Sequence, residues 1–152
     1  MAKPKKQIAA LPIRWNKNGK LRVLLVTSRE TRRWVMPKGW PMEGKKPWRA
    51  AEIEALEEAG INGTMSRIAI GTYDYKKKLR DGSRKKCRVK LFPMHVTRIR
   101  KKWPERNQRR RKWFSVKAAA RAVNEPELVE ILKLLAKKPK SVPQIEEFRK
   151  AS

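Results

Sequence analysis

The sequence predicts an α/β fold in which a mixed β-sheet packs against helices. Short runs rich in Val, Leu and Ile alternate along the chain with two or three segments of helical periodicity, an order typical of such sheets. The length of 152 residues suits one domain with a single hydrophobic core. A hydrophobic content of 39% with six Trp is too high for a disordered basic chain, so we expect a folded protein.

The first half of the chain supplies three strand candidates. Residues 7–13 and 21–27 are apolar runs separated by a turn-like segment that contains Asn18-Gly19, which is typical of a β-hairpin. Residues 33–36 form a third, short candidate that ends at Pro37. These segments predict the beginning of the sheet.

A helix is expected from Pro47 to Ala59, because Pro suits the first helical turn and Gly60 suits the left-handed position that ends a helix. Three small residues on one side of this helix would allow it to lie close to the sheet: Ala51, Ala55 and Ala59. The later candidates are strands at 64–75, 85–97 and 112–115, a short helix from Val116, and a longer helix over 127–137 with Leu128, Ile131, Leu132 and Leu135 on its core face.

The charge is the most unusual property of the composition. Lys and Arg total 41 against 14 Asp and Glu, which gives a formal net charge of +27 and indicates a polyanionic partner or substrate. Because Cys87 and His95 are the only residues of their types, the sequence excludes a disulfide framework and metal sites rich in Cys or His. No apolar stretch reaches the roughly 18 residues needed to cross a bilayer, and none has the length of a signal peptide core, so we expect a cytoplasmic protein without membrane contact.

Three carboxylates share one face of the predicted helix. Glu54, Glu57 and Glu58 stand at positions i, i+3 and i+4, where like charges repel unless a cation lies between them. Hard divalent cations such as Mg²⁺ bind carboxylate oxygens in this way. The alternative is a solvated acidic face that pairs with neighbouring Lys and Arg. The preceding loop, with Lys38 and Gly39, favours the metal site because its backbone could approach a phosphate or a metal ion.

Residues 39–61 resemble the signature of the Nudix hydrolases, G-x5-E-x7-R-E-U-x-E-E-x-G-U, in which U is aliphatic. Two positions differ, since Lys45 stands where the signature has its first Glu and Ile53 stands where it has Arg. The segment at 34–39 is also similar to the strand that leads into the family's loop. The matching positions are Gly39, Glu54, Glu57, Glu58, Gly60 and Ile61.

The resemblance implies an α/β/α sandwich with a mixed sheet. The strands and helices over about residues 7–137 fit this fold, so we expect one domain over 1–137, followed by a loosely held basic tail at 138–152.

For the chemistry, the resemblance implies a hydrolase that cleaves a diphosphate linkage with Mg²⁺ or Mn²⁺. The principal metal ligands would be Glu54 and Glu58, and Glu57 would contribute to the metal or to a water. Glu57 and a loop acid outside the motif are both candidates for the general base. The missing Glu and Arg are opposite charges lost together, so neither leaves an unpaired partner, and Glu43 or Glu52 could replace the lost ligand.

Basic residues close to the motif are the expected phosphate ligands. Arg32, Arg33 and Lys38, with Gly39, precede the helix, and guanidinium groups bind phosphate oxygens in pairs. The Pro-Lys-Gly-Trp loop is similar to that of family members acting on diphosphoinositol polyphosphates or dinucleoside polyphosphates. The expected substrate is therefore a small molecule that contains a polyphosphate.

A second hypothesis is a catalytically weak or inactive protein of the same fold that binds nucleic acid. Its binding surface would be the basic segment at 98–112, where Trp103 and Trp113 could stack on bases. For Trp113, which lies in a predicted strand, the sequence favours a core position instead. The sequence does not determine the oligomeric state.

Overall fold

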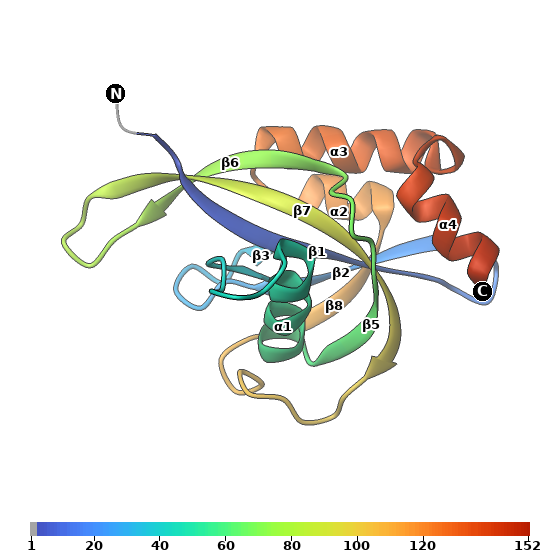
Figure 1. Ribbon diagram of the computed structural model, residues 1–152, viewed down its shortest axis with the longest axis horizontal. Coiled ribbons are helices and arrows are strands. Elements are labelled where there is room, and N and C mark those ends of the chain that lie inside the picture. Colours follow the sequence, from blue (N-terminus) through green and yellow to red (C-terminus); the bar gives the residue numbers. More distant parts are fainter. Residues whose placement is uncertain (1–2) are drawn as a thin grey trace.

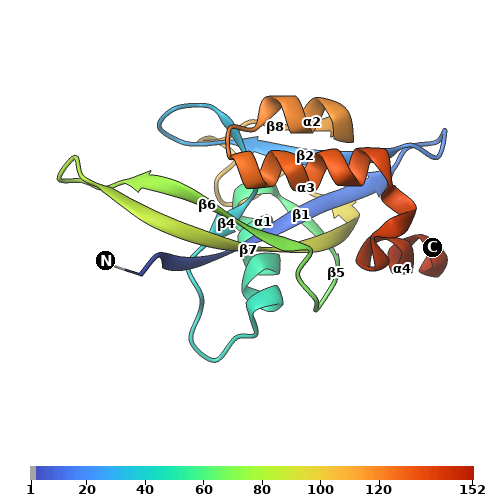
Figure 2. The ribbon, with the colours of Figure 1, turned by 90° about the horizontal axis from the view of Figure 1, so that it is seen from above.

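The computed structural model describes residues 3–152, and its centre is a mixed β-sheet (Figure 1). Helix α1 (Pro47–Ala59) covers one face of this sheet, and α2 (Val116–Ala122) and α3 (Pro126–Lys137) cover the other (Figure 2). The predicted α/β/α sandwich is confirmed.

Two long strands, β1 (Lys5–Trp15) and β7 (Arg84–Ile99), form the centre of the sheet, and the shorter strands lie on either side of them. The first strand, β1, pairs in parallel with β7, and antiparallel with β2 and β4. The other edge of β7 pairs with β5 and β6, while β2 also pairs with β3 and β8. Within residues 3–152 the strands are β1 (Lys5–Trp15), β2 (Leu21–Thr27), β3 (Trp34–Val35), β4 (Lys38–Gly39), β5 (Ile61–Met65), β6 (Gly71–Lys78), β7 (Arg84–Ile99) and β8 (Arg111–Ser115).

The single strand predicted at 64–75 is wrong. The chain forms two strands here, because β5 ends at Met65 and β6 begins at Gly71, and they pair with different halves of β7. Between them the Ser66 hydroxyl accepts a hydrogen bond from the Ile68 N–H, a local turn that competes with strand pairing. The apolar Ile68 that suggested a continuous strand is exposed.

Each face of the sheet has its own hydrophobic core. On one face, Ala51, Ala55 and Ala59 of α1 are fully buried, as expected for a helix that lies close to a sheet. On the other face the core includes the predicted leucines of α3, which are Leu128, Leu132 and Leu135.

The C-terminal residues differ from the expected loose tail. Residues Pro139–Ser141 form a short 3-10 helix (η1), and Pro143–Ala151 form α4. Ile145 and Phe148 of α4 are buried, and the Phe148 ring lies 5.7 Å from that of His95. The prediction of a loose tail at 138–152 is therefore wrong for this helix, because its apolar side joins the core.

None of the helices in the described part of the chain combines the length and apolar composition that crossing a bilayer requires.

Candidate active site

Helix α1 and strand β4 place the predicted residues beside one another. The helix has the predicted bounds, with Pro47 in its first turn and Gly60 at φ 67° beyond its last turn. Strand β4 pairs with β1 at Ile8 and Ala9, which brings its backbone next to the acidic side of α1. The motif loop and the motif helix therefore form one site.

Glu58 is the best-anchored of the three carboxylates. Its side chain is 8% exposed, and its Oε1 accepts a hydrogen bond from the backbone N–H of Lys38 at 3.2 Å. Its Oε2 accepts a hydrogen bond from Arg109 Nη2 at 3.1 Å. Both carboxylate oxygens of Glu58 are thus engaged by donors from distant parts of the chain.

Glu54 lies against the backbone of β4. A Cβ atom added at Gly39 would collide with the Glu54 carboxylate group where it now lies, so the glycine lets this side chain rest directly on the backbone. The first glycine of the motif is therefore the point at which the Glu54 carboxylate contacts β4.

Arg109 is a site residue that the sequence reasoning missed. Its side chain is 9% exposed, and besides Glu58 it donates hydrogen bonds to Glu105 Oε1 at 2.7 Å and to the carbonyl oxygen of Thr27 at 3.0 Å. Arg109 stands in a run of basic residues that we interpreted as surface, and no spacing distinguishes it from its neighbours. Glu105 is the loop acid that the structure brings to the site.

Two further residues fix the loop to the end of α1. Trp103 Nε1 donates a hydrogen bond to the Glu58 carbonyl at 3.1 Å, and a Cβ added at Gly60 would come within 2.6 Å of the Trp103 ring. The guanidinium of Arg111 lies 3.9 Å from the centre of this ring and donates to the Ala59 carbonyl at 2.8 Å.

These contacts change the interpretation of residues 98–112 as a nucleic-acid-binding surface. Arg109, Arg111 and Trp103 are used inside the protein, so this prediction is wrong for them. The core position favoured for Trp113 is confirmed, because its ring packs against the core on the α1 side and lies under the guanidinium of Arg14 at 4.1 Å.

The carboxylates perturb one another. The pKa of Glu54 is raised to about 7, first because burial disfavours its charge and then because Glu58, Glu57 and Glu105 are negative. Burial also raises the pKa of Glu58, and the positive charges of Arg109 and Lys38 oppose that effect. The site is an acidic cluster held in a basic protein.

A second cluster of charged side chains, formed by Lys38 of β4 with Arg33 and Glu125, lies next to these carboxylates. Burial lowers the pKa of Lys38, whose ammonium lies 5.1 Å from the centre of the Tyr75 ring. Arg33, a predicted phosphate ligand, instead forms an ion pair with Glu125 at 2.7 Å. The negative charges of Glu58 and then Glu125 oppose the effect of burial on the pKa of Lys38, so this lysine is influenced by the carboxylate site as well as by the Arg33–Glu125 pair.

Arg32 is placed differently from the other predicted basic residues. It lies in the turn before β3 with a φ of 57° and is exposed. Across residues 3–152, no hydrogen bond or ion pair joins its side chain to the site carboxylates.

The NUDIX domain model matches residues 5–135 of this sequence. The chain belongs to the Nudix family. It is 35% identical over 103 residues to Nudix hydrolase 12, mitochondrial, of Arabidopsis thaliana, an alignment that covers 66% of this chain and 51% of that protein. It is 29% identical over 121 residues to diphosphoinositol polyphosphate phosphohydrolase 3-beta of Bos taurus, covering 78% and 69% of the two chains. The chain spans about half the length of the Arabidopsis Nudix hydrolases 12 and 13.

Solved structures confirm the Nudix fold. The C. elegans Ap4A hydrolase binary complex superposes with a TM-score of 0.66 at 21% identity, covering 90% of this chain and 98% of that one. The MutT protein from Methanosarcina mazei Go1 gives a TM-score of 0.65 at 19% identity, with coverage of 92% and 99%.

Glu43 and Glu52, the predicted substitutes for the Glu that is missing from the Nudix signature, do not take its place as ligands. Lys45 is exposed, and so is Glu43. Glu52 forms an ion pair with Arg49 at 2.8 Å along the helix, and it is absent from the groups that perturb Glu54. Neither Glu43 nor Glu52 is placed as a ligand beside Glu54 and Glu58.

Carboxylate oxygens are the ligands that a hard divalent cation prefers. For Glu58 to offer its Oε2 atom to a cation, the hydrogen bond from Arg109 would have to break. The charges of Glu58, Glu57 and Glu105 all act on Glu54, so these carboxylates lie in one region of the protein. Within the described part of the chain, no three Asp, Glu, His or Cys side chains converge as a metal-binding group. In this arrangement Arg109, rather than a cation, is the partner of the Glu58 Oε2 atom.

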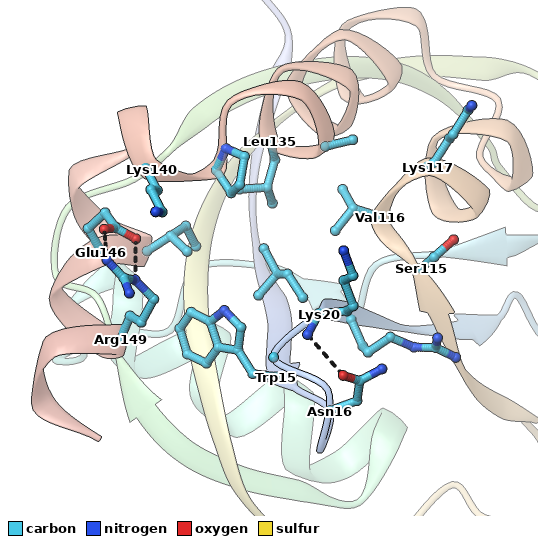
Figure 3. A pocket seen from close by; sticks show the side chains of 16 residues that line it. Trp15, Asn16, Lys20, Ser115, Val116, Lys117, Leu135, Lys140, Glu146 and Arg149 are labelled. Carbon is cyan, nitrogen blue, oxygen red and sulfur yellow. Dashed lines mark hydrogen bonds and ion pairs between the residues drawn. The ribbon is translucent and has the colours of Figure 1, made fainter.

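A hollow of about 510 Å³ lies elsewhere on the molecule, between the β1–β2 turn, the end of α3, and α4 (Figure 3). Trp15 and Leu135 lie against it, and the Glu146–Arg149 ion pair stands at its side. The residues described as lining it include none of the motif carboxylates.

Proposed function

We propose that this protein is a metal-dependent hydrolase that cleaves a diphosphate linkage. Its substrate would be a nucleoside diphosphate linked to another group, a dinucleoside polyphosphate or a diphosphoinositol polyphosphate. The observation that carries the proposal is the position of Glu54 and Glu58 directly against the backbone of Lys38 and Gly39. The names of the relatives, which include diphosphoinositol polyphosphate phosphohydrolases, support the substrate class.

Glu54 and Glu58 would hold Mg²⁺ or Mn²⁺, with Glu57 contributing to the metal or to a water. A bound divalent ion would neutralise phosphate charge and lower the pKa of the attacking water. The Glu54 carboxylate lies where a side chain of residue 39 would be, so a phosphate group bound beside Gly39 would meet a cation held by this carboxylate. Lys38 stays a predicted phosphate ligand.

Arg109 would have to release the Oε2 atom of Glu58 when the cation binds. Its other partners, Glu105 and the Thr27 carbonyl, can keep the guanidinium in the same loop after that release. The positive charge would then lie near the substrate phosphates rather than on a metal ligand.

Two carboxylates remain candidates for the general base. Glu57 belongs to the motif helix, and Glu105 lies in the loop whose backbone N–H donates to the Glu57 carbonyl at 3.1 Å. This contact places the loop acid beside the helix, within the group of charges that acts on Glu54. A cytoplasmic location and the absence of membrane contact stay predictions.

The experiment is phosphate release from a panel of the three substrate classes with Mg²⁺, with Mn²⁺ and with a chelator. Glu58→Gln removes a proposed ligand charge and should lower kcat by about 100-fold or more. Glu52→Gln is the matched control, because Glu52 lies on the same helix and pairs with Arg49 away from the site. Equal activity of the two variants, or release that a chelator does not affect, would contradict the proposal.

A further inference from the structure

The hairpin formed by β6 and β7 extends past the helices as a separate arm, visible in both views of the ribbon (Figures 1 and 2). We call residues 76–88 the basic arm. Eight of these 13 residues are Lys or Arg, and the one acidic residue is Asp81 in the turn. The carboxylate of Asp81 is used locally, since it accepts a hydrogen bond from the Ser83 N–H at 2.8 Å. The positive charge is therefore denser here than in the chain as a whole.

The register of the two strands places like charges directly opposite one another. The consecutive cross-strand pairs are Lys76 with Lys86, Lys77 with Lys85, and Lys78 with Arg84. Like charges in such positions destabilise a hairpin. At the base of the arm, Asp74 forms ion pairs with Arg88 at 2.8 Å and Lys86 at 3.4 Å. This single carboxylate cannot neutralise the other cations of the arm. An anionic partner would remove this repulsion.

Both faces of the arm carry cations. Side chains alternate along a strand, so Lys76, Lys78 and Arg84 lie on one face, and Lys77 and Lys85 lie on the other. The beginning of β1 runs beside the base of the arm and adds further lysines, with Lys5 opposite Cys87 and Lys6 opposite Arg88. The arm is thus a narrow ribbon that is positive on two sides.

We propose that the basic arm binds a nucleic-acid duplex by lying in a groove between its two phosphate backbones. The major groove of B-form DNA is about 12 Å wide and admits a two-stranded β-ribbon, so phosphates would face both sides of the arm. A flat anionic membrane would meet only one of the two cationic faces. Single-stranded nucleic acid is bound largely by stacking on aromatic side chains, and the arm contains none.

The contacts would be made by Lys and Arg to phosphate oxygens. Such contacts carry little sequence information and depend strongly on salt, because each one releases a condensed counterion. The arm lies on strands outside the carboxylate site, so duplex binding and diphosphate hydrolysis can be measured separately.

The test compares two variants with the same change in net charge. The arm variant is Lys76→Ala, Lys77→Ala, Lys78→Ala and Arg84→Ala, which leaves the ion pairs of Asp74 in place. The control variant replaces four exposed lysines of α2, α3 and η1 by Ala, namely Lys117, Lys133, Lys137 and Lys140. Binding to a labelled DNA duplex is measured over a salt series, beside an RNA duplex, a single strand of the same length, and vesicles that contain anionic lipid.

We expect the wild-type protein and the control variant to bind the DNA duplex with a steep salt dependence. The arm variant should bind more weakly, and its slope of log K against log salt should be shallower by about 0.9 for each phosphate that it no longer neutralises. Tighter binding to the RNA duplex would overturn the proposed geometry, because the major groove of A-form RNA is deep and narrow. Replacing the same three lysines by Arg should preserve binding, because the charges remain.

The proposal fails if the control variant loses as much affinity as the arm variant, since net charge alone would then explain binding. Equal binding by the arm variant and the wild type, tighter binding to vesicles or single strands than to duplexes, or no binding at all would also overturn it. Thermal unfolding of the arm variant should show no loss of stability, because the substitutions remove repulsion. Its unchanged hydrolysis of a small diphosphate substrate would show that the site is intact.

Discussion

Replacing Arg109 by Ala should strongly destabilise the protein when no metal is present. The substitution removes the cation that holds Glu58 and Glu105, and it also removes the hydrogen bond to the Thr27 carbonyl. The Arg109 and Glu58 side chains are 9% and 8% exposed, so a negative charge would be left buried without its partner. Breaking a buried ion pair in this way costs about 3–5 kcal/mol. In a protein of this size, that corresponds to a fall in Tm of roughly 6–20 °C.

The assay is thermal unfolding of Arg109→Ala by circular dichroism in the presence of a chelator. Arg106→Ala is the control, because Arg106 is an exposed residue of the same loop with the same charge. The difference between the two variants should be larger at pH 8 than at pH 5. Burial already raises the pKa of Glu58 and Arg109 opposes this rise, so without Arg109 the carboxyl group takes up a proton more readily as the pH falls.

Millimolar Mg²⁺ should restore part of the lost stability if Glu58 is a metal ligand, since the cation would replace the missing guanidinium. A Tm of Arg109→Ala within about 2 °C of that of Arg106→Ala at pH 8, well below the shift expected for a broken buried pair, would refute the reasoning. It would mean that the Glu58–Arg109 pair contributes little to the folded state.

Three other predictions concern the site and the C-terminal helix. In chelator, wild-type stability should fall as the pH rises from about 4.5 to about 7, because the raised pKa of Glu54 means that its carboxyl group binds a proton more tightly in the folded state than in the unfolded state. Glu54→Gln should therefore raise Tm at pH 8 and change it little at pH 4. Millimolar Mg²⁺ or Mn²⁺ should raise the wild-type Tm, and an unchanged midpoint would count against a metal site. Phe148→Ala should lower the free energy of unfolding by about 3 kcal/mol in a urea titration, against little change for the exposed Glu147→Ala; equal effects would mean that α4 is held loosely.

Local sequence signals predicted the bounds of α1 and the shared position of its carboxylates. Pro47 and Gly60 act on their own stretch of backbone, so the bounds of the helix could be inferred without knowledge of the fold. The spacing of Glu54, Glu57 and Glu58 is also local, since helical geometry alone puts them on one side. The same reasoning predicted Leu21–Thr27 as a strand with its observed bounds.

Long-range contacts could not be predicted in this way. Arg109 and Glu58 are 51 residues apart, and a run of basic residues does not show which one turns inward. The break between β5 and β6 depends on pairing with two halves of β7, which periodicity does not reveal. The apolar Val142, which precedes α4, and Ile145 and Phe148 within it stand in a largely polar segment, and their burial depends on a surface supplied by the rest of the fold.

The contact between Gly60 and Trp103 joins the end of the motif helix to the loop that carries Glu105 and Arg109. Arg111 also takes part in this contact, because its guanidinium lies over the Trp103 ring and donates to the Ala59 carbonyl. A designer who wished to alter substrate preference by exchanging this loop with that of another family member could not treat it as a separable part. The graft would have to bring its own ring and its own cation to the same glycine, or the acid and the arginine would lose their position relative to the helix.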